Sequence, residues 1–95
     1  MKELKHLFEP LSIGGMEVKN RIVMSPMGTN LASHSGEVTQ ALIDYHVARA
    51  KGDVGLIITE DVTIGPRYGL NTLKLNDDKY IPGWKELTAK VHEFG

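Results

Sequence analysis

Two polar segments of this 95-residue sequence could bind a ligand, and each directly follows a short apolar run. Residues 25–30 (Ser-Pro-Met-Gly-Thr-Asn) follow Ile-Val-Met, and residues 59–61 (Thr-Glu-Asp) follow Val-Gly-Leu-Ile-Ile. In parallel α/β folds ligands bind at the carboxyl ends of the strands, so both segments would lie on one ligand-binding face. A purely structural interpretation also fits, in which Ser25-Pro26 ends a strand and Glu60 forms a salt bridge or a cap. Position alone leaves both interpretations open.

Familiar motifs for nucleotide, nucleophilic and metal chemistry are absent from the sequence. There is no GxGxxG, GxxxxGK[ST], GxSxG or HExxH pattern, and no cysteine that could form a disulfide, a thiolate zinc site or an iron–sulfur cluster. Among the histidines, His46 lies on the apolar side of a predicted helix and fits a packed or solvent-edge position. His92 fits a surface position, and His34 lies in the first long loop. We therefore predict no metal site. Met27, beside the proposed ligand face, could cover an aromatic ring.

The first elements that the sequence predicts are a hairpin and a strand. Residues 11–13 and 16–18 are short alternating runs on either side of Gly14-Gly15, a pattern typical of a β-hairpin. Residues 22–24 are apolar and mostly β-branched, and they stop at Ser25-Pro26, which indicates a buried strand. Residues 25–38 then form a long loop, and loops of this length in compact domains are usually functional or disordered.

A βαβ unit and a second helix follow. Thr39 as N-cap, apolar residues at helical spacing and Gly52 as the C′ residue predict a helix over 40–51. Residues 54–58 are continuously apolar, as in a parallel strand covered on both faces, so strands 22–24 and 54–58 should be adjacent. Residues 59–78 predict a second polar loop. Pro82 and the apolar spacing after it predict a helix that ends near Gly95.

Several stretches resemble the old yellow enzyme family of FMN-dependent ene reductases. They are Leu-Phe-Glu-Pro-Leu at 7–11, Val-Lys-Asn-Arg-Ile-Val-Met-Ser-Pro-Met at 18–27, Arg-Ala-Lys-Gly at 49–52 and Val-Gly-Leu-Ile-Ile-Thr-Glu at 54–60. The resemblance extends past Pro-Gly-Trp at 82–84 and covers nearly the whole chain. It implies an α/β fold, the N-terminal quarter of a TIM (β/α)8 barrel. Residues 1–95 would be one partial domain, with an N-terminal β-hairpin (11–18) followed by βαβα, the first two βα units (22–95).

The resemblance also implies flavin chemistry. NADH or NADPH would reduce FMN, and the flavin would pass hydride to an alkene conjugated to a carbonyl, in a small unsaturated carbonyl compound or an acyl-CoA. By motif match, Ser25, Pro26, Met27 and Gly28 would line the flavin ring, and Asp61 would lie beside the same ring. No catalytic residue is expected in this segment, because those of the relatives would lie beyond residue 95.

Three positions depart from the family pattern. Relatives often have a hydroxyl or thiol where Gly28 stands, and the nearby hydroxyl here is that of Thr29. Relatives usually have a small residue where Asp61 stands, and a carboxylate there would oppose the anionic reduced flavin. Asn30 stands where some relatives have an aromatic substrate residue. Residues 28–30 look more like the 2,4-dienoyl-CoA reductase, enoate reductase and NADH oxidase branch, whose longer chains add a 4Fe-4S cluster and an FAD domain.

Composition and length complete the expectations. Hydrophobic residues make up 41% and charged residues 24%, and the formal charge is −1, so neither nucleic acid nor a membrane is an expected partner and the cytoplasm is the expected location. A (β/α)8 barrel takes about 250 residues. We therefore expect an N-terminal fragment of a homo-oligomeric flavoenzyme. The alternative is a non-catalytic truncated module that self-associates without flavin, through Leu56, Ile58, Trp84 and Leu87. Some other barrel enzyme is disfavoured by the specific motif at 19–27.

Overall fold

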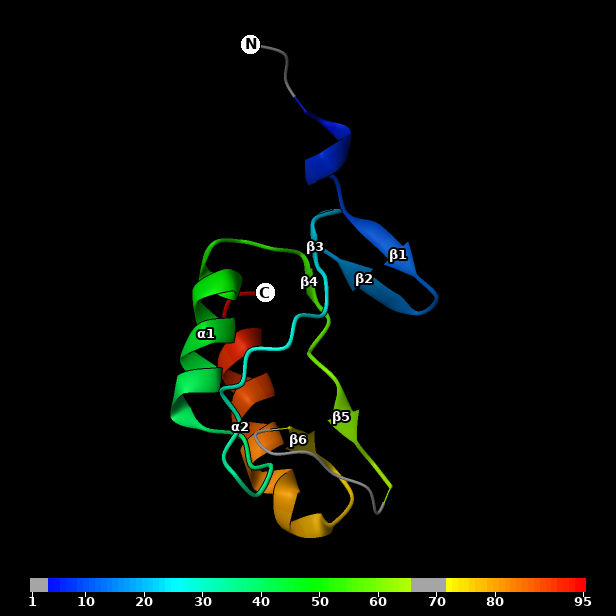
Figure 1. The fold of residues 1–95 in the computed structure, drawn as a ribbon. Helices are drawn as coiled ribbons and strands as arrows, with labels where there is room; N and C mark the ends of the chain where they lie inside the picture. The colour runs from blue at the N-terminus through cyan, green and yellow to red at the C-terminus, as the bar shows by residue number, and fades with distance from the viewer. Residues whose placement is uncertain (1–3, 66–71) are drawn as a thin grey trace.

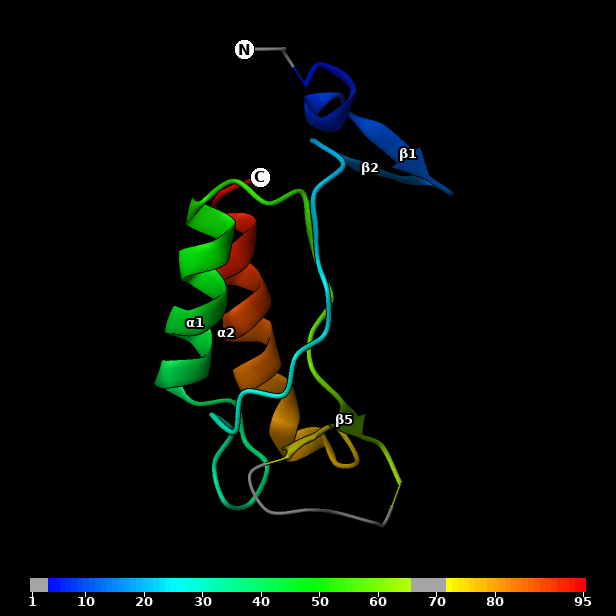
Figure 2. The ribbon, with the colours of Figure 1, turned by 45° about the horizontal axis from the view of Figure 1, so that its top comes forward.

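The computed structural model describes residues 4–65 and 72–95. Along the chain its elements are η1 (His6–Phe8), β1 (Leu11–Ile13), β2 (Met16–Val18), β3 (Val23–Met24), α1 (Gln40–Lys51), β4 (Leu56–Ile57), β5 (Val62–Thr63), β6 (Leu73–Lys74), η2 (Asp78–Tyr80) and α2 (Ile81–His92). The two α-helices lie side by side, with β3 and β4 running beside them (Figure 1). The β1–β2 hairpin stands away from the helices in both views (Figure 2).

The predicted hairpin is confirmed. β1 and β2 pair antiparallel, with Leu11 opposite Val18 and Ile13 opposite Met16. Gly14, in the turn, has φ +60°, a left-handed conformation that glycine adopts without steric cost. Val18 is buried, whereas most of the hairpin is exposed, so the hairpin is attached to the rest of the chain chiefly at this end.

The parallel βαβ unit is also confirmed. Val23 lies opposite Leu56 and Met24 opposite Ile57, and α1 forms the crossover between the two strands. Both strands are shorter than the predicted 22–24 and 54–58, and neither is buried as predicted, because Val23 is 48% exposed and Leu56 and Ile57 are only half-buried. The backbone hydrogen bonds between the two segments nevertheless extend beyond the assigned strands. The amides of Gly55 and Leu56 donate to the carbonyl of Ile22, and the amide of Ile58 donates to the carbonyl of Met24.

Helix α1 has the predicted bounds and the predicted N-cap. The Thr39 hydroxyl accepts a hydrogen bond from the amide of Leu42 at 3.1 Å. The prediction of Gly52 as the C′ residue was wrong. Gly52 has φ −75°, and the left-handed residue after the helix is Asp53, with φ +76°. Asp53 is held there by tertiary partners, since its carbonyl accepts from the Asn20 side chain at 2.8 Å.

Helix α2 begins at Ile81, has Pro82 in its first turn and ends at His92, as the sequence predicts. Gly95, just beyond the end, has φ +103°. Leu87 is buried and Trp84 is half-buried. The indole of Trp84 donates to the carbonyl of Lys74 at 3.2 Å, which connects α2 to β6.

The prediction of a loop over 59–78 was wrong in part. Val62 and Thr63 in β5 pair parallel with Leu73 and Lys74 in β6, and η2 follows. Strands of two residues give no readable alternation in a sequence, and tertiary packing stabilises them instead. Residues 66–71 lie outside the described part of the chain.

The core is small and lies where loop 25–38, the helices and β6 meet. Ala32, Leu42 and Leu73 are fully or almost fully buried together, with Leu31, Val38, Val62 and Trp84 packed around them. Loop 25–38 therefore contributes to the core although it forms no helix or strand. Within residues 4–65 and 72–95, no helix has the length and apolar character that crossing a membrane requires.

Candidate functional site

The parallel pairing of β3 and β4 brings the two polar segments to the same edge of the sheet. There they border an open hollow of about 650 Å³, whose lining is formed by Pro26, Met27, Gly28, Thr29, Asn30, Glu60, Asp61 and Thr72. Four of the five predicted site residues thus lie together around one space. Ser25 is exposed and does not line the hollow. Thr72 was missed, because no sequence pattern relates it to two strands that precede it by many residues.

The first side of the hollow is formed by the segment directly after β3. The Met27 side chain is 62% exposed, and a Cβ added at Gly28 would meet no atom within 4 Å. In the described part of the chain, no group accepts a hydrogen bond from the amides of Met27 and Gly28. Asn30, with φ +61°, turns the chain away from the strand direction. This side therefore has an exposed apolar side chain and two backbone amides that form no hydrogen bond within the described residues.

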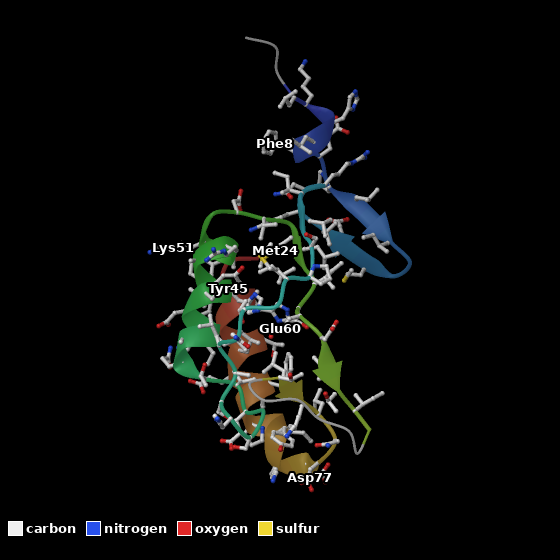
Figure 3. The ribbon with its side chains drawn as sticks, viewed as in Figure 1. Phe8, Met24, Tyr45, Lys51, Glu60 and Asp77 are labelled. Carbon is white, nitrogen blue, oxygen red and sulfur yellow. The ribbon has the colours of Figure 1, made fainter. Side chains whose placement is uncertain are left out.

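The second side contains a buried acid, Glu60, which lies where β4 leads toward β5 (Figure 3). Glu60 is only 8% exposed, whereas its neighbour Asp61 is exposed. The Thr29 hydroxyl donates to Glu60 Oε1 at 2.6 Å, and in the described residues Glu60 forms no ion pair. Glu60 therefore does not form the salt bridge that the purely structural interpretation allowed. Instead it accepts a hydrogen bond that crosses from one polar segment to the other.

The histidines do not contribute to the hollow. His46 is 2% exposed, and neither of its ring nitrogens has a hydrogen-bond partner in the described residues, which confirms it as a packed histidine. Burial lowers the pKa of His46, and the positive charge of Arg49 lowers it further, while the carboxylate of Glu60 opposes both effects. His34 and His92 are exposed, and no group of acidic and histidine side chains in the described residues could hold a metal ion.

A second cavity, of about 360 Å³, lies between β4 and α2. Leu56 and Ile57 line one side, and Trp84, Leu87 and Val91 line the other. Its lining is mainly apolar, and it contains none of the residues of the first hollow. This cavity is therefore separate from the polar hollow.

The amino ends of the two strands are joined by Lys19 and Asn20, a role that no motif in the sequence indicates. The buried Asn20 side chain accepts from the amide of Ile22 at 3.0 Å and donates to the carbonyl of Asp53. Lys19 pairs with the Asp53 carboxylate at 2.6 Å and donates to the carbonyl of Phe94 at 2.5 Å. These contacts align β3 with β4 at the end opposite to the hollow.

Comparison with known proteins identifies the family. Residues 6–95 match the NADH:flavin oxidoreductase / NADH oxidase family. The chain is 50% identical over 98 residues to an NADH oxidase of Thermoanaerobacter brockii, covering 100% of this chain and 15% of that protein. It is 32% identical over 100 residues to a cinnamate reductase of Clostridium sporogenes, covering 98% of this chain and 15% of that protein.

A solved structure has the same fold. The crystal structure of Old Yellow Enzyme from Pichia sp. AKU4542 superposes with a TM-score of 0.87 at 30% identity, covering 95% of this chain and 24% of that one. The present chain thus spans about a quarter of that enzyme and less of the two relatives. The chain belongs to the NADH:flavin oxidoreductase / NADH oxidase family, and its fold is the N-terminal part of the (β/α)8 barrel found in the old yellow enzymes.

Proposed function

We propose that this chain is one partial domain, the flavin-facing first part of an FMN-dependent oxidoreductase that takes hydride from NADH or NADPH. The observation that carries the proposal is the hollow at the carboxyl ends of β3 and β4, within the stretch that matches the family. In a (β/α)8 barrel this is the end at which cofactors and substrates bind. Residues outside this segment would complete the barrel, its phosphate site and its substrate site.

The residues around the hollow fit a flavin ring. An isoalloxazine is flat, with apolar faces and a polar edge, and the first side of the hollow offers the exposed Met27 side chain and two available amides. The absence of a side chain at Gly28 leaves the backbone open to close approach, because nothing lies within 4 Å of its Cβ position. Oxidised isoalloxazine is neutral, so the nearby carboxylates of Glu60 and Asp61 do not oppose its binding.

Each residue then has a defined part. The Met27 side chain packs on the ring, as a polarizable thioether does on aromatic groups. The amides of Met27 and Gly28 donate to the polar edge, and Asp61 places a carboxylate beside the ring. The Thr29 hydroxyl, which could have replaced the hydroxyl missing at Gly28, instead donates to Glu60. When bound, FMN supplies the hydride chemistry, and the protein contributes orientation and electrostatics.

For the acceptor, we propose an alkene conjugated to a carbonyl or carboxyl group. The resemblance to ene reductases and the similarity to a cinnamate reductase support this class, since cinnamate is an alkene of this kind. The similarity to an NADH oxidase supports a second acceptor, dioxygen. A cytoplasmic, homo-oligomeric enzyme remains our expectation. An iron–sulfur cluster would belong to a longer parent chain, because this segment has no cysteine, and the FAD domain of the resembling branch would belong there too.

Assays of the native protein that contains these residues test the proposal. We expect purified protein to contain FMN and to oxidise NADH or NADPH without oxygen only when cinnamate or 2-cyclohexenone is added. The saturated product, measured by chromatography, should form in equal amount to the nicotinamide oxidised. Oxidation that requires oxygen and yields no saturated product would favour the oxidase alternative. Protein without flavin, which also fails to bind added FMN, would contradict the proposal.

A further inference from the structure

Glu60 is the one acidic side chain that is buried in the described part of the chain. Removing a carboxylate from water is costly unless hydrogen bonds compensate for the lost hydration. Here a strong bond is present, because the Thr29 hydroxyl donates to Oε1 at 2.6 Å. Bonds from hydroxyls to carboxylates at this distance are about twice as strong as those between neutral groups. The acid is therefore stably held at this position.

Thr29 is itself held in one orientation. Its oxygen accepts from the amide of Leu31 at 3.2 Å while its proton is donated to Glu60. Beyond Thr29 the loop is well anchored, since the carbonyl of Leu31 accepts from Thr39 and Leu31 packs against the core. The bond to Glu60 is thus the point at which the anchored part of the loop begins.

The segment between β3 and Thr29 has no comparable anchor. In residues 4–65 and 72–95, the carbonyl of Met24 accepts from Ile58, and no hydrogen bond involves residues 25–28. These residues are held only at their two ends, by the strand and by Thr29. The second end is fastened to Glu60, which directly precedes Asp61. Beyond the strand pairing, the bond between Thr29 and Glu60 therefore connects the two sides of the hollow.

We propose that Glu60 is a positioning residue, which acts through Thr29 to hold residues 26–28 in the orientation that contacts the flavin. This inference rests on the proposed function. It assigns to Glu60 and Thr29 no contact with the flavin and no step of the reaction. It predicts that flavin affinity depends on the bond between the two side chains, not on either side chain alone.

The test compares FMN affinity among variants of the native protein, measured by quenching of flavin fluorescence when apoprotein is titrated with FMN. Thr29→Val and Glu60→Ala each remove the bond, and we expect each to weaken FMN binding about tenfold, because residues 26–28 must then be ordered when FMN binds. The double variant should bind FMN no more weakly than either single variant. Thr29→Ser and Glu60→Gln keep a donor and an acceptor, so both should bind FMN nearly as tightly as wild type.

Two controls separate positioning from general stability. Ser35→Ala removes an exposed hydroxyl–carboxylate bond to Glu37 in the same loop and should leave FMN affinity unchanged. Tyr80→Phe removes the bond from the Tyr80 hydroxyl to the carbonyl of Ser35 and should lower the melting temperature, with FMN affinity unchanged, because neither residue lines the hollow. If Glu60→Ala does not fold, the comparison of Thr29→Val with Thr29→Ser still decides the matter.

The possible results are distinguishable. Wild-type protein that binds no FMN would refute the proposed function and this inference with it. Tight FMN binding by wild type, Thr29→Val and Glu60→Ala alike would overturn the inference alone. Additive losses in the double variant, or losses in Thr29→Ser equal to those in Thr29→Val, would overturn it as well.

Discussion

Met27 illustrates how a single residue can be matched to the proposed cofactor. The Met27 side chain is 62% exposed, and it borders a hollow beside backbone amides that have no hydrogen-bond partner in the described residues. The exposure is explained if a flat aromatic ligand covers the side chain in the complete protein.

Met27→Asp should therefore weaken FMN binding and alter the visible spectrum of the bound flavin. A carboxylate removes the apolar contact and adds negative charge beside a ring that becomes anionic on reduction. Ile64→Asp is a matched control, because Ile64 is 79% exposed and does not line the hollow. Equal flavin content, spectrum and turnover in Met27→Asp and wild type would show that Met27 does not face the flavin.

His46 predicts a dependence of stability on pH. Burial holds the pKa of His46 below its ordinary value of 6.5. The unfolded chain consequently binds a proton more readily than the folded chain as the pH falls through 6.5. The stabilising contribution of neutral His46 is present above pH 6.5 and is progressively lost below it.

Urea unfolding of the native protein between pH 7.5 and 5 should show this loss. His46→Phe should reduce the slope of unfolding free energy against pH, whereas His34→Gln, at an exposed position, should retain it. Identical slopes in wild type and His46→Phe would contradict the assignment.

At the scale of elements, the starts of β3 and β4 are aligned where the backbone of Gly55 lies directly against Asn20. A Cβ added at Gly55 would collide with the side chain and carbonyl of Asn20. The Asn20 amide also binds the left-handed Asp53, so the turn after α1, the start of β4 and the start of β3 form one arrangement. Parallel register at this end determines which residues emerge at the other end, next to the hollow.

Gly55→Ala should therefore destabilise the protein by about 1–3 kcal/mol, the usual cost of overpacking. Gly65→Ala is the matched control, because a Cβ there would meet no atom within 4 Å, and its effect should stay within about 0.5 kcal/mol. Thermal and urea unfolding measure both variants. A Gly55→Ala protein as stable as Gly65→Ala would mean that Asn20 can move away without cost.

For the whole molecule, the described residues form a small core and leave much apolar surface uncovered. Ile58, at the carboxyl end of β4, is 46% exposed, and β4 pairs with β3 alone among the described strands. Unpaired strand edges favour association with other chains. Of the four residues predicted to drive self-association, Leu87 is only 2% exposed, so Ile58 and the half-buried Leu56 and Trp84 are the available ones.

The isolated 95-residue chain should therefore associate, and it should not hold FMN tightly. One part of a barrel offers only one flank for the ring. Sedimentation with and without FMN measures both properties, and Ile58→Glu should shift the chain toward smaller species, while Ile81→Glu, at the start of α2, should not. A soluble monomer that binds FMN at micromolar affinity, about −8 kcal/mol, would contradict this expectation.

Local features of the sequence were enough to predict the hairpin, the bounds of α1, the start of α2 and the parallel βαβ order. Each of these features depends on residues that are neighbours in the sequence. They are a glycine pair in the hairpin turn, a threonine N-cap at position 39, a proline in the first turn of α2, and continuous apolar runs in the two parallel strands. Strand direction then placed residues 26–28 and Asp61 on one face without reference to coordinates.

Only the tertiary structure decided the features that join distant residues. Asp53 rather than Gly52 is left-handed because Asn20, 33 positions earlier, binds its carbonyl. The β5–β6 pair exists because Leu73 packs into the core, not because two residues carry a strand pattern. Glu60 is bound by Thr29, 31 positions away, rather than by a cation. Such pairings depend on how the folded chain brings distant segments together. The local sequence of either segment does not show which other segment it will contact.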